Sequence, residues 1–256
     1  MELKGLQKLR EHVPDLRSST RITWIGIYAF GIFSLTVIFF VYVKDSIPDW
    51  SLDGQAIILT IGFLLLRMFF TNKEAYLFRH GELAFRNAFV RFVLPGLALI
   101  FATVVHIGYM PGPGLPIGWW TPILPIAGWS FLLLGIALWI RAILVFGLDN
   151  LTMLYVYFPK KSRRVENNIY SVLRHPVYAG ALRISIGLAL LNGNAFALFS
   201  GLLLMPFGLT VWARLVEEKE LIERFGTEYL EYRKRTPAFW PRLRNLGMFY
   251  QFVLKG

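Results

Sequence analysis

Long apolar segments alternate with short polar ones along this chain of 256 residues. A helix that crosses the hydrocarbon core of a bilayer needs about 20 residues, with a range of roughly 17–25. Because the bilayer core offers the backbone no hydrogen-bonding partner, such segments are expected to be helices. The pattern predicts six membrane-spanning helices, at residues 22–43, 54–72, 88–109, 119–147, 176–191 and 195–213.

The last two predicted spans are short and are joined only by Asn192-Gly193-Asn194, which predicts a tight helical hairpin. Residues 214–232 have apolar positions on one helical face, so we expect an amphipathic helix on the cytoplasmic side that folds back as a lid. Gly226 is expected at a close contact of this lid. The predicted fold class is an all-α polytopic membrane bundle of about six transmembrane helices with this C-terminal amphipathic helix.

The amino-acid composition indicates a membrane protein and excludes several kinds of functional site. Hydrophobic residues make up 55% of the chain, above the roughly 45–50% of soluble domains. The absence of cysteine excludes disulfides, zinc–thiolate sites, iron–sulfur clusters and a cysteine nucleophile. No metal-binding histidine spacing and no glycine-rich phosphate loop occur. The net charge of +11 comes without a basic nucleic-acid-binding helix, so no nucleic-acid partner and no metal are expected.

Basic residues are distributed unevenly between the predicted loops. They are concentrated in residues 1–21, 67–91, 148–175 and the tail after residue 213. The loops on the other side hold a single lysine between them, in residues 44–53, 110–118 and 192–194. Cytoplasmic loops carry the excess of Lys and Arg in membrane proteins. An integral membrane protein with both termini in the cytoplasm is therefore expected, with nothing to indicate which membrane.

The predicted organisation has three parts. Residues 1–21 are a basic N-terminal arm, residues 22–118 hold three spans, and residues 119–256 form a C-terminal core with three spans, a cytoplasmic helix and a tail. The core carries the candidate chemistry, because charged and aromatic residues gather where its hairpin leaves the membrane. Polar groups at that depth are costly unless they bind something or each other.

The run Arg174-His175-Pro176 opens the fifth predicted span. Proline suits the first helical turn, where a missing N–H costs nothing. Free backbone N–H groups and the positive end of the helix dipole could hold an anionic group at this point. Alternatively, Arg174 contacts lipid phosphate and His175 caps the helix.

Three more residues of this span are candidates. Tyr178 follows the opening run, and Gly180 permits close approach of either a ligand or another helix. Arg183 lies deep in the span, where an arginine usually faces the bundle interior or a wet cavity. It could meet an acidic substrate group, or pair with a buried carbonyl or with a nearby glutamate.

Glu217 and Glu218 follow the last span, and Arg214 precedes them by three and four residues. On an α-helix adjacent side chains point about 100° apart. One carboxylate could then pair with Arg214 while the other faces a ligand, and carboxylates accept hydrogen bonds from ribose hydroxyls or an ammonium group. The alternative is a solvated charged face.

The ordered set of these residues resembles the integral-membrane methyltransferases, including isoprenylcysteine carboxyl methyltransferase and phosphatidylethanolamine N-methyltransferase. The matching residues are Arg174, His175, Pro176, Tyr178, Gly180, Arg214, Glu217, Glu218, Leu221, Phe225, Gly226, Tyr229, Tyr232 and Pro241. The resemblance covers roughly the last 100 residues, from Trp139 onward, and residues 1–120 match no family. One departure is Asn168-Ile169-Tyr170, where the family often has Gly-Pro-Tyr.

The resemblance implies S-adenosylmethionine bound at the cytoplasmic face and a lipid or lipidated acceptor that enters from the bilayer. It implies the cofactor-binding residues Tyr170, His175, Pro176, Tyr178, Gly180, Arg214, Glu217 and Glu218. It implies a catalytic role for Arg174, Tyr178 and Arg183, with an arginine orienting the acceptor. Two alternatives stay open: a nicotinamide-dependent membrane reductase of the sterol-reductase type, and a non-catalytic membrane protein.

Overall fold

The computed structural model describes residues 4–116, 118, 121–162 and 165–255. Within these ranges the chain is almost entirely helical and has no β-strand, and one isolated backbone bridge joins Gly114 to Asn194. The predicted all-α class is confirmed. The predicted first residue of the fourth span, Trp119, lies outside the described residues.

Five helices of the described chain are long and apolar enough to cross a membrane. They are Ser19–Ser46, Pro48–Thr71, Lys73–Ile107, Ile123–Phe146 and Ala195–Phe225. The other predicted span is α11 (Pro176–Asn192), an apolar helix of 17 residues, which is at the lower limit for a spanning helix. Five of the six predicted spans are therefore present as membrane-length helices, and the count of six is not confirmed.

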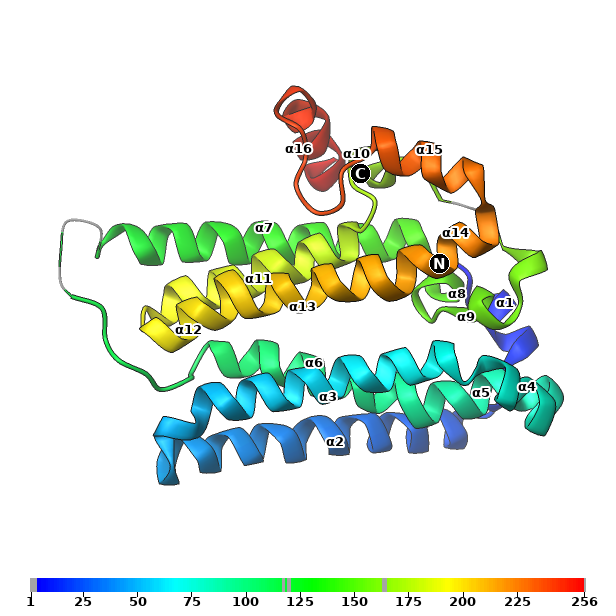
Figure 1. Ribbon diagram of the computed structural model, residues 1–256, viewed down its shortest axis with the longest axis horizontal. Helices are drawn as coiled ribbons and strands as arrows, with labels where there is room; N and C mark the ends of the chain where they lie inside the picture. The colour runs from blue at the N-terminus through cyan, green and yellow to red at the C-terminus, as the bar shows by residue number, and fades with distance from the viewer. Residues whose placement is uncertain (1–3, 117, 119–120, 163–164, 256) are drawn as a thin grey trace.

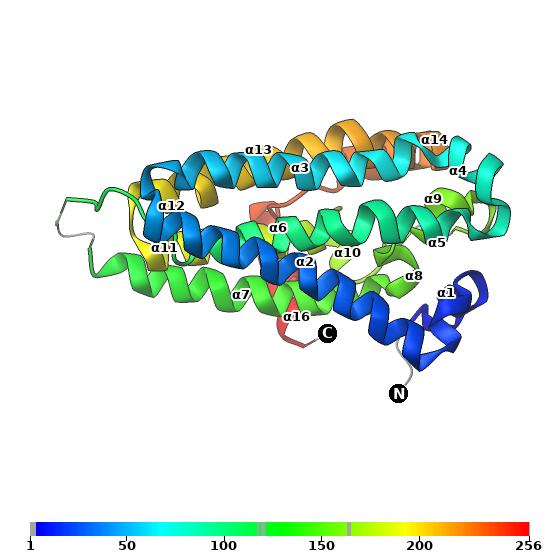
Figure 2. The same ribbon diagram turned by 90° about the horizontal axis from the view of Figure 1, so that it is seen from below.

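The long helices form two layers (Figure 1). One layer holds α2 (Ser19–Ser46), α3 (Ser51–Thr71) and α6 (Leu94–Ile107). The other holds α7 (Ile123–Phe146), α11 and α13 (Met205–Trp212). Viewed from below, α3 runs beside α13, so the two layers meet there (Figure 2). The N-terminal and C-terminal halves of the chain are thus apposed along their length.

Glycines bring α7 and α11 close together. A Cβ on Gly180 would lie 2.8 Å from the Cβ of Trp139, and one on Gly187 would lie 2.6 Å from the backbone nitrogen of Leu132. Small residues at such contacts let membrane helices approach closely. Of the two predicted uses of Gly180, approach of another helix is the one that these distances show.

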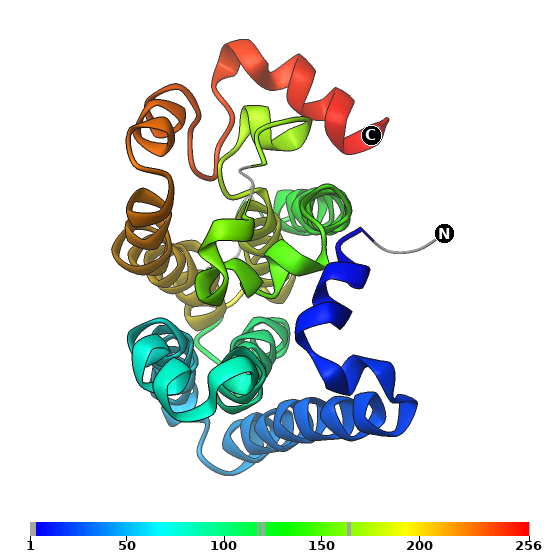
Figure 3. The ribbon, with the colours of Figure 1, turned by 90° about the vertical axis from the view of Figure 1, so that its right-hand side faces the viewer.

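Short helices gather at one end of the bundle, which we call the polar end (Figures 1 and 3). They include α1 (Leu6–His12), α4 (Lys73–His80), α5 (Ala84–Ala88), α8 (Leu148–Leu151) and α9 (Leu154–Tyr157). The N-terminal arm packs here, because the backbone N–H of Leu148 donates to the carbonyl of Lys4 at 2.8 Å. Leu9 and Val13 are buried in the same apolar cluster as Phe85.

The chain after the last span breaks at Gly226. This residue has φ +58°, and a Cβ there would meet no atom within 4 Å. The expected continuous helix over 214–232 is therefore wrong, as is the expected close contact at Gly226. Glycine is instead needed for the left-handed backbone between α14 (Glu218–Phe225) and α15 (Thr227–Arg235). Beyond α15 lies the C-terminal strap, residues 236–255, which ends in α16 (Leu246–Leu254).

Candidate active site

Pro176 begins α11 and His175 is the residue directly before it, as the sequence predicted. The two residues before the helix are tied to the strap. The N–H of Arg174 donates to the carbonyl of Pro237 at 2.9 Å, and that of His175 donates to the carbonyl of Ala238 at 3.1 Å. The strap thus fixes the backbone that leads into α11.

Glu218 joins the start of α11 to the last span. Its Oε1 accepts from Arg174 Nη2 at 2.8 Å and Nε at 3.1 Å, and from His175 Nε2 at 3.0 Å. The Glu218 side chain is 1% exposed and that of His175 is 3% exposed. Because a carboxylate only accepts hydrogen bonds, Nε2 of His175 carries the proton. Glu218 therefore fixes both residues in place.

Arg214 is exposed, forms no ion pair with either glutamate and lines neither of the cavities below. The predicted Arg214 partnership is therefore wrong, and Arg174 takes that place. The reason is local: residues Ala213–Glu217 form a π-helical turn, which is wider than an α-helical one and is frequent at functional sites. The turn shifts the register on which the α-helical prediction depended.

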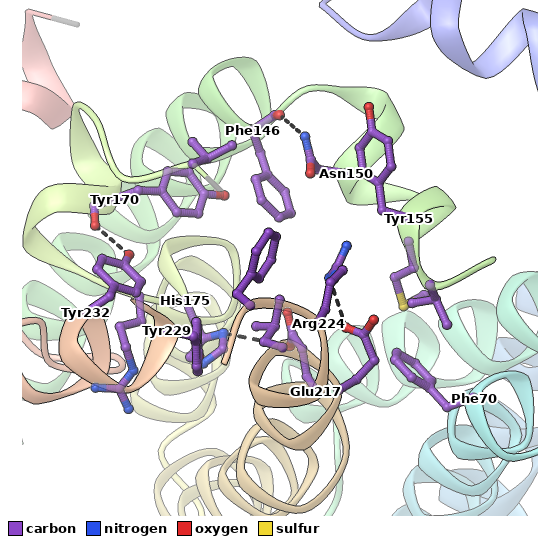
Figure 4. Close-up of a pocket in the computed structure, with 17 residues that line it drawn as sticks. Phe70, Phe146, Asn150, Tyr155, Tyr170, His175, Glu217, Arg224, Tyr229 and Tyr232 are labelled. Carbon is purple, nitrogen blue, oxygen red and sulfur yellow. Dashed lines mark hydrogen bonds and ion pairs between the residues drawn. The ribbon is translucent and has the colours of Figure 1, made fainter. Parts of the chain in front are cut away.

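A polar pocket opens beside this cluster (Figure 4). Its walls come from α3, α7 to α10, α14 and α15, and include Phe70, Phe146, Asn150, Met153, Tyr155, Tyr170, Arg174, His175, Glu217, Glu220, Arg224, Tyr229 and Tyr232. Three buried atoms of this wall have no hydrogen-bond partner in the described chain: Glu217 Oε2, Arg224 Nε and the hydroxyl oxygen of Tyr229. His175 Nδ1 lies 3.7 Å from Glu217 Oε2, too far for a hydrogen bond. Buried polar atoms are normally paired, so these three mark where a ligand would find an acceptor and two donors.

The tyrosines of the pocket keep their protons. Burial, with the nearby carboxylates adding to it, raises the pKa of Tyr229 and of Tyr170 above the ordinary value. Tyr232 donates its hydroxyl hydrogen to the carbonyl of Tyr170 at 2.6 Å, and the Tyr170 ring stacks on Phe146 with centroids 5.0 Å apart. Tyr170, from α10 (Ile169–Val172), therefore offers a fixed aromatic face to the pocket.

A second, mostly apolar cavity of about 1240 Å³, including its open part, lies between the two layers of helices. The N-terminal layer contributes Phe63, Leu66, Leu97, Ile100 and Phe101, and the other layer contributes residues such as Trp139, Pro176, Val177, Tyr178 and Trp212. It shares Phe146, Asn150, Met153, Tyr170, Arg174, His175 and Glu217 with the polar pocket. The two cavities thus meet at Glu217.

Tyr178 and Pro176 lie on the apolar side of this junction. Trp212 Nε1 donates to the Tyr178 hydroxyl at 3.1 Å, and the Tyr178 ring stacks on His175 with centroids 5.5 Å apart. The Tyr178 hydroxyl accepts that bond, and the neighbouring Glu217 carboxylate is placed to accept its hydrogen.

Arg183 lines neither cavity. It is 2% exposed, and its Nη1 donates to the carbonyls of Ala179 at 2.8 Å and Phe239 at 3.2 Å. Its guanidinium carbon lies 4.4 Å from the ring centre of Trp240. Among the predicted alternatives, pairing with buried carbonyls is the one that these contacts show.

The sequence reasoning missed the wall formed by the segment after α7. Met153 and Tyr155 carried no recognisable motif, and neither did Asn150, whose side chain donates to the carbonyl of Phe146 at 3.0 Å. Phe70 was one of many span aromatics. Among the described residues there is no group of three side chains suited to hold a metal ion.

Comparison with known proteins places these features in context. The phospholipid methyltransferase family model matches residues 124–228. Protein-S-isoprenylcysteine O-methyltransferase B of Arabidopsis thaliana is 28% identical over 151 residues, which is 57% of this chain and 72% of the plant protein. The human protein-S-isoprenylcysteine O-methyltransferase is 37% identical over 87 residues, which is 32% of this chain and 28% of that protein.

One bacterial relative does not carry the name of a methyltransferase. The nickel-cobalt-cadmium resistance protein NccN of Alcaligenes xylosoxydans xylosoxydans is 31% identical over 115 residues, covering 41% of this chain and 53% of that protein. The chain thus spans less than two thirds of the human and bacterial relatives. No solved structure matches it. The family match begins at residue 124, so the first three long helices lie outside it.

Proposed function

We propose that this chain, which matches the phospholipid methyltransferase family model over residues 124–228, transfers a methyl group from S-adenosylmethionine to a lipid or lipidated acceptor. The family match favours this function over the reductase and non-catalytic alternatives. The observation that carries the proposal is the meeting of a polar pocket and an apolar cavity at Glu217. A methyl donor and a lipid chain need those two environments side by side.

The residues of the polar pocket fit the cofactor. S-adenosylmethionine has ribose hydroxyls and an ammonium group that donate hydrogen bonds, and a carboxylate that accepts them. Glu217 Oε2 and the protonated Tyr229 hydroxyl, neither of which has a hydrogen-bond partner in the described chain, match those two needs. Phe146 and Tyr170 offer ring faces, which attract a sulfonium cation. When bound, the cofactor supplies a methyl group that is electrophilic without further activation.

The task of the protein is then positioning and exclusion of water. Arg174 and His175 are fixed by Glu218 at the boundary of both cavities, where they can orient an anionic acceptor group. Tyr178, held by Trp212 and Glu217, places its hydroxyl at the same boundary. A carboxylate acceptor needs no base. Catalytic positioning is therefore assigned to Arg174 and Tyr178. Arg183 is not included because it lines neither cavity.

The three predicted parts of the chain have separate uses in this proposal. The core from residue 119 onward supplies the cofactor pocket together with Phe70, while residues 22–118 supply one wall of the acceptor cavity. The arm of residues 1–21 packs at the polar end. This end faces the cytoplasm in the proposed orientation, where S-adenosylmethionine is available.

Calorimetric titration of the full chain in nanodiscs with S-adenosylmethionine tests the cofactor assignment. We expect Glu217→Gln and Tyr229→Phe each to weaken binding about tenfold, because a hydrogen bond to a charged group contributes about 1.5–3 kcal/mol. Glu231→Gln is the matched control, since it removes a charge from an exposed position on α15. Absence of binding by the unmodified chain, or equal affinities of Glu217→Gln and Glu231→Gln, would contradict the proposal.

A further inference from the structure

The C-terminal strap has a composition unlike the segments of the polar end. Residues 236–255 contain no acidic residue, and they hold Arg242, Arg244 and Lys255 together with five aromatic residues. Basic residues combined with Trp, Phe and Leu are typical of helices that lie in the interface of a membrane. The strap is therefore suited to an anionic lipid surface rather than to water alone.

The strap buries one apolar face and exposes another. Phe249 and Val253 are 1% and 2% exposed and pack in a cluster with Leu138 of α7. On the outer side, large apolar residues are open: Trp240, Leu243, Met248, Tyr250 and Leu254. Leu243 is 85% exposed and Leu254 is 70% exposed, which is a poor arrangement for a segment surrounded by water.

The direction of α16 fits a position in the membrane plane. Figure 3 looks along the bundle, so α3, α7 and α11 appear end-on while α16 is seen from its side. When the long helices cross a bilayer, α16 therefore lies roughly parallel to its surface. It sits on the outer flank of α7, and Arg141 Nε of that helix donates to the carbonyl of Val253 at 3.3 Å.

The inner edge of the strap is bonded to the candidate active site. The carbonyls of Pro237 and Ala238 accept from the backbone of Arg174 and His175, and the carbonyl of Thr236 accepts from the Arg174 guanidinium. One residue later, the carbonyl of Phe239 accepts from Arg183. A change in how the strap is held would therefore reach the cluster around Glu218.

We propose that the C-terminal strap binds an anionic lipid surface, and that this contact steadies Arg174 and His175 so that anionic lipid tightens cofactor binding. The second half of this inference rests on the proposed function; the first half does not. Arg244 and Lys255 are the exposed charges that meet the lipid. Each basic residue near an anionic surface strengthens attachment by roughly fivefold.

Site-specific labelling tests the lipid contact without any cofactor. The chain has no cysteine, so Tyr250→Cys and Lys160→Cys each give a single labelling site. Lys160 is exposed and basic but lies outside the strap. In vesicles containing brominated phosphatidylglycerol, we expect a fluorophore at position 250 to be quenched strongly and one at position 160 weakly. Equal quenching at the two positions, or equal quenching at position 250 by brominated phosphatidylcholine, would overturn anionic-surface binding.

Titration with S-adenosylmethionine in nanodiscs tests the coupling. We expect severalfold tighter binding in phosphatidylglycerol-containing discs than in phosphatidylcholine discs. The double variant Arg244→Gln/Lys255→Gln should lose this gain and keep the affinity seen in phosphatidylcholine, whereas Lys160→Gln should keep the gain. Retention of the gain by the double variant would overturn the coupling. Failure to bind the cofactor in any lipid would overturn the proposed function, while the quenching experiment would still decide the lipid contact.

Discussion

Replacement of Glu218 by alanine most sharply distinguishes the structural role of Glu218 from the ligand-binding role proposed for Glu217. The Glu218 side chain is 1% exposed, and its carboxylate forms ion pairs with Arg174, which is 11% exposed, and with His175, which is 3% exposed. Loss of one partner from a buried ion pair costs about 3–5 kcal/mol, because the remaining charge is left uncompensated. Arg233 lies 3.4 Å from Glu218 but is 44% exposed, so its share is at most about 1 kcal/mol.

We therefore expect Glu218→Ala to lower the free energy of unfolding by about 3–5 kcal/mol. Glu217→Ala should change it by less than about 1 kcal/mol, since Glu217 Oε2 has no hydrogen-bond partner and its ion pair with His175 Nδ1 is long, at 3.7 Å. Unfolding by sodium dodecyl sulfate, followed by tryptophan fluorescence in mixed micelles, measures both values. A double-mutant cycle with Arg174→Ala isolates the pair. Equal effects of the two glutamate variants, or a coupling energy near zero, would refute the reasoning.

Three further predictions concern parts remote from the pocket. Arg183→Leu should release the strap, which would be measured as faster protease cleavage after residue 236. Arg242→Leu should not speed this cleavage. Equal cleavage of the two variants would contradict the role of the contact between Arg183 and the carbonyl of Phe239. Gly187→Leu should prevent α7 and α11 from packing, because a Cβ there lies 2.6 Å from backbone, so a fully folded variant would be contrary to expectation. Asp15 is buried, which opposes ionisation, but Arg86 and Arg21 together hold its pKa below the usual value. The stabilising effect of the Asp15 carboxylate is therefore present above its unfolded-state pKa and is lost as pH falls through its folded-state pKa. Asp15→Asn should lower the melting temperature at neutral pH and lower it less below about pH 4. A loss of melting temperature that is independent of pH would argue against the ion pairs.

The sequence was sufficient for features that depend on local pattern. Apolar length located the spans, and Pro176 located the start of α11, because proline fits a first turn and little else in a helix. The spacing of the motif also placed Arg174, His175 and the two glutamates in one region. These side chains do meet, through Glu218.

Features that depend on register or on distant packing were not predictable. The π-helical turn before Glu218 changed which way Arg214 points. The pattern of apolar residues does not predict such a turn. Arg183 found its partners in the strap, which follows it by more than fifty residues. The apolar cavity needed Phe63 and Leu97 from the other layer. In a membrane span, a residue that faces a cavity and one that faces lipid are equally apolar, so the sequence does not separate them.

The most direct test of the central claim is transfer of a labelled methyl group from S-adenosylmethionine to an isoprenylcysteine analogue by the purified chain in nanodiscs. We expect the unmodified chain and Glu231→Gln to transfer the label, and Glu217→Gln to lose most of the rate at a fixed cofactor concentration. No transfer by the unmodified chain to this or any other lipid acceptor, or undiminished transfer by Glu217→Gln, would contradict the account.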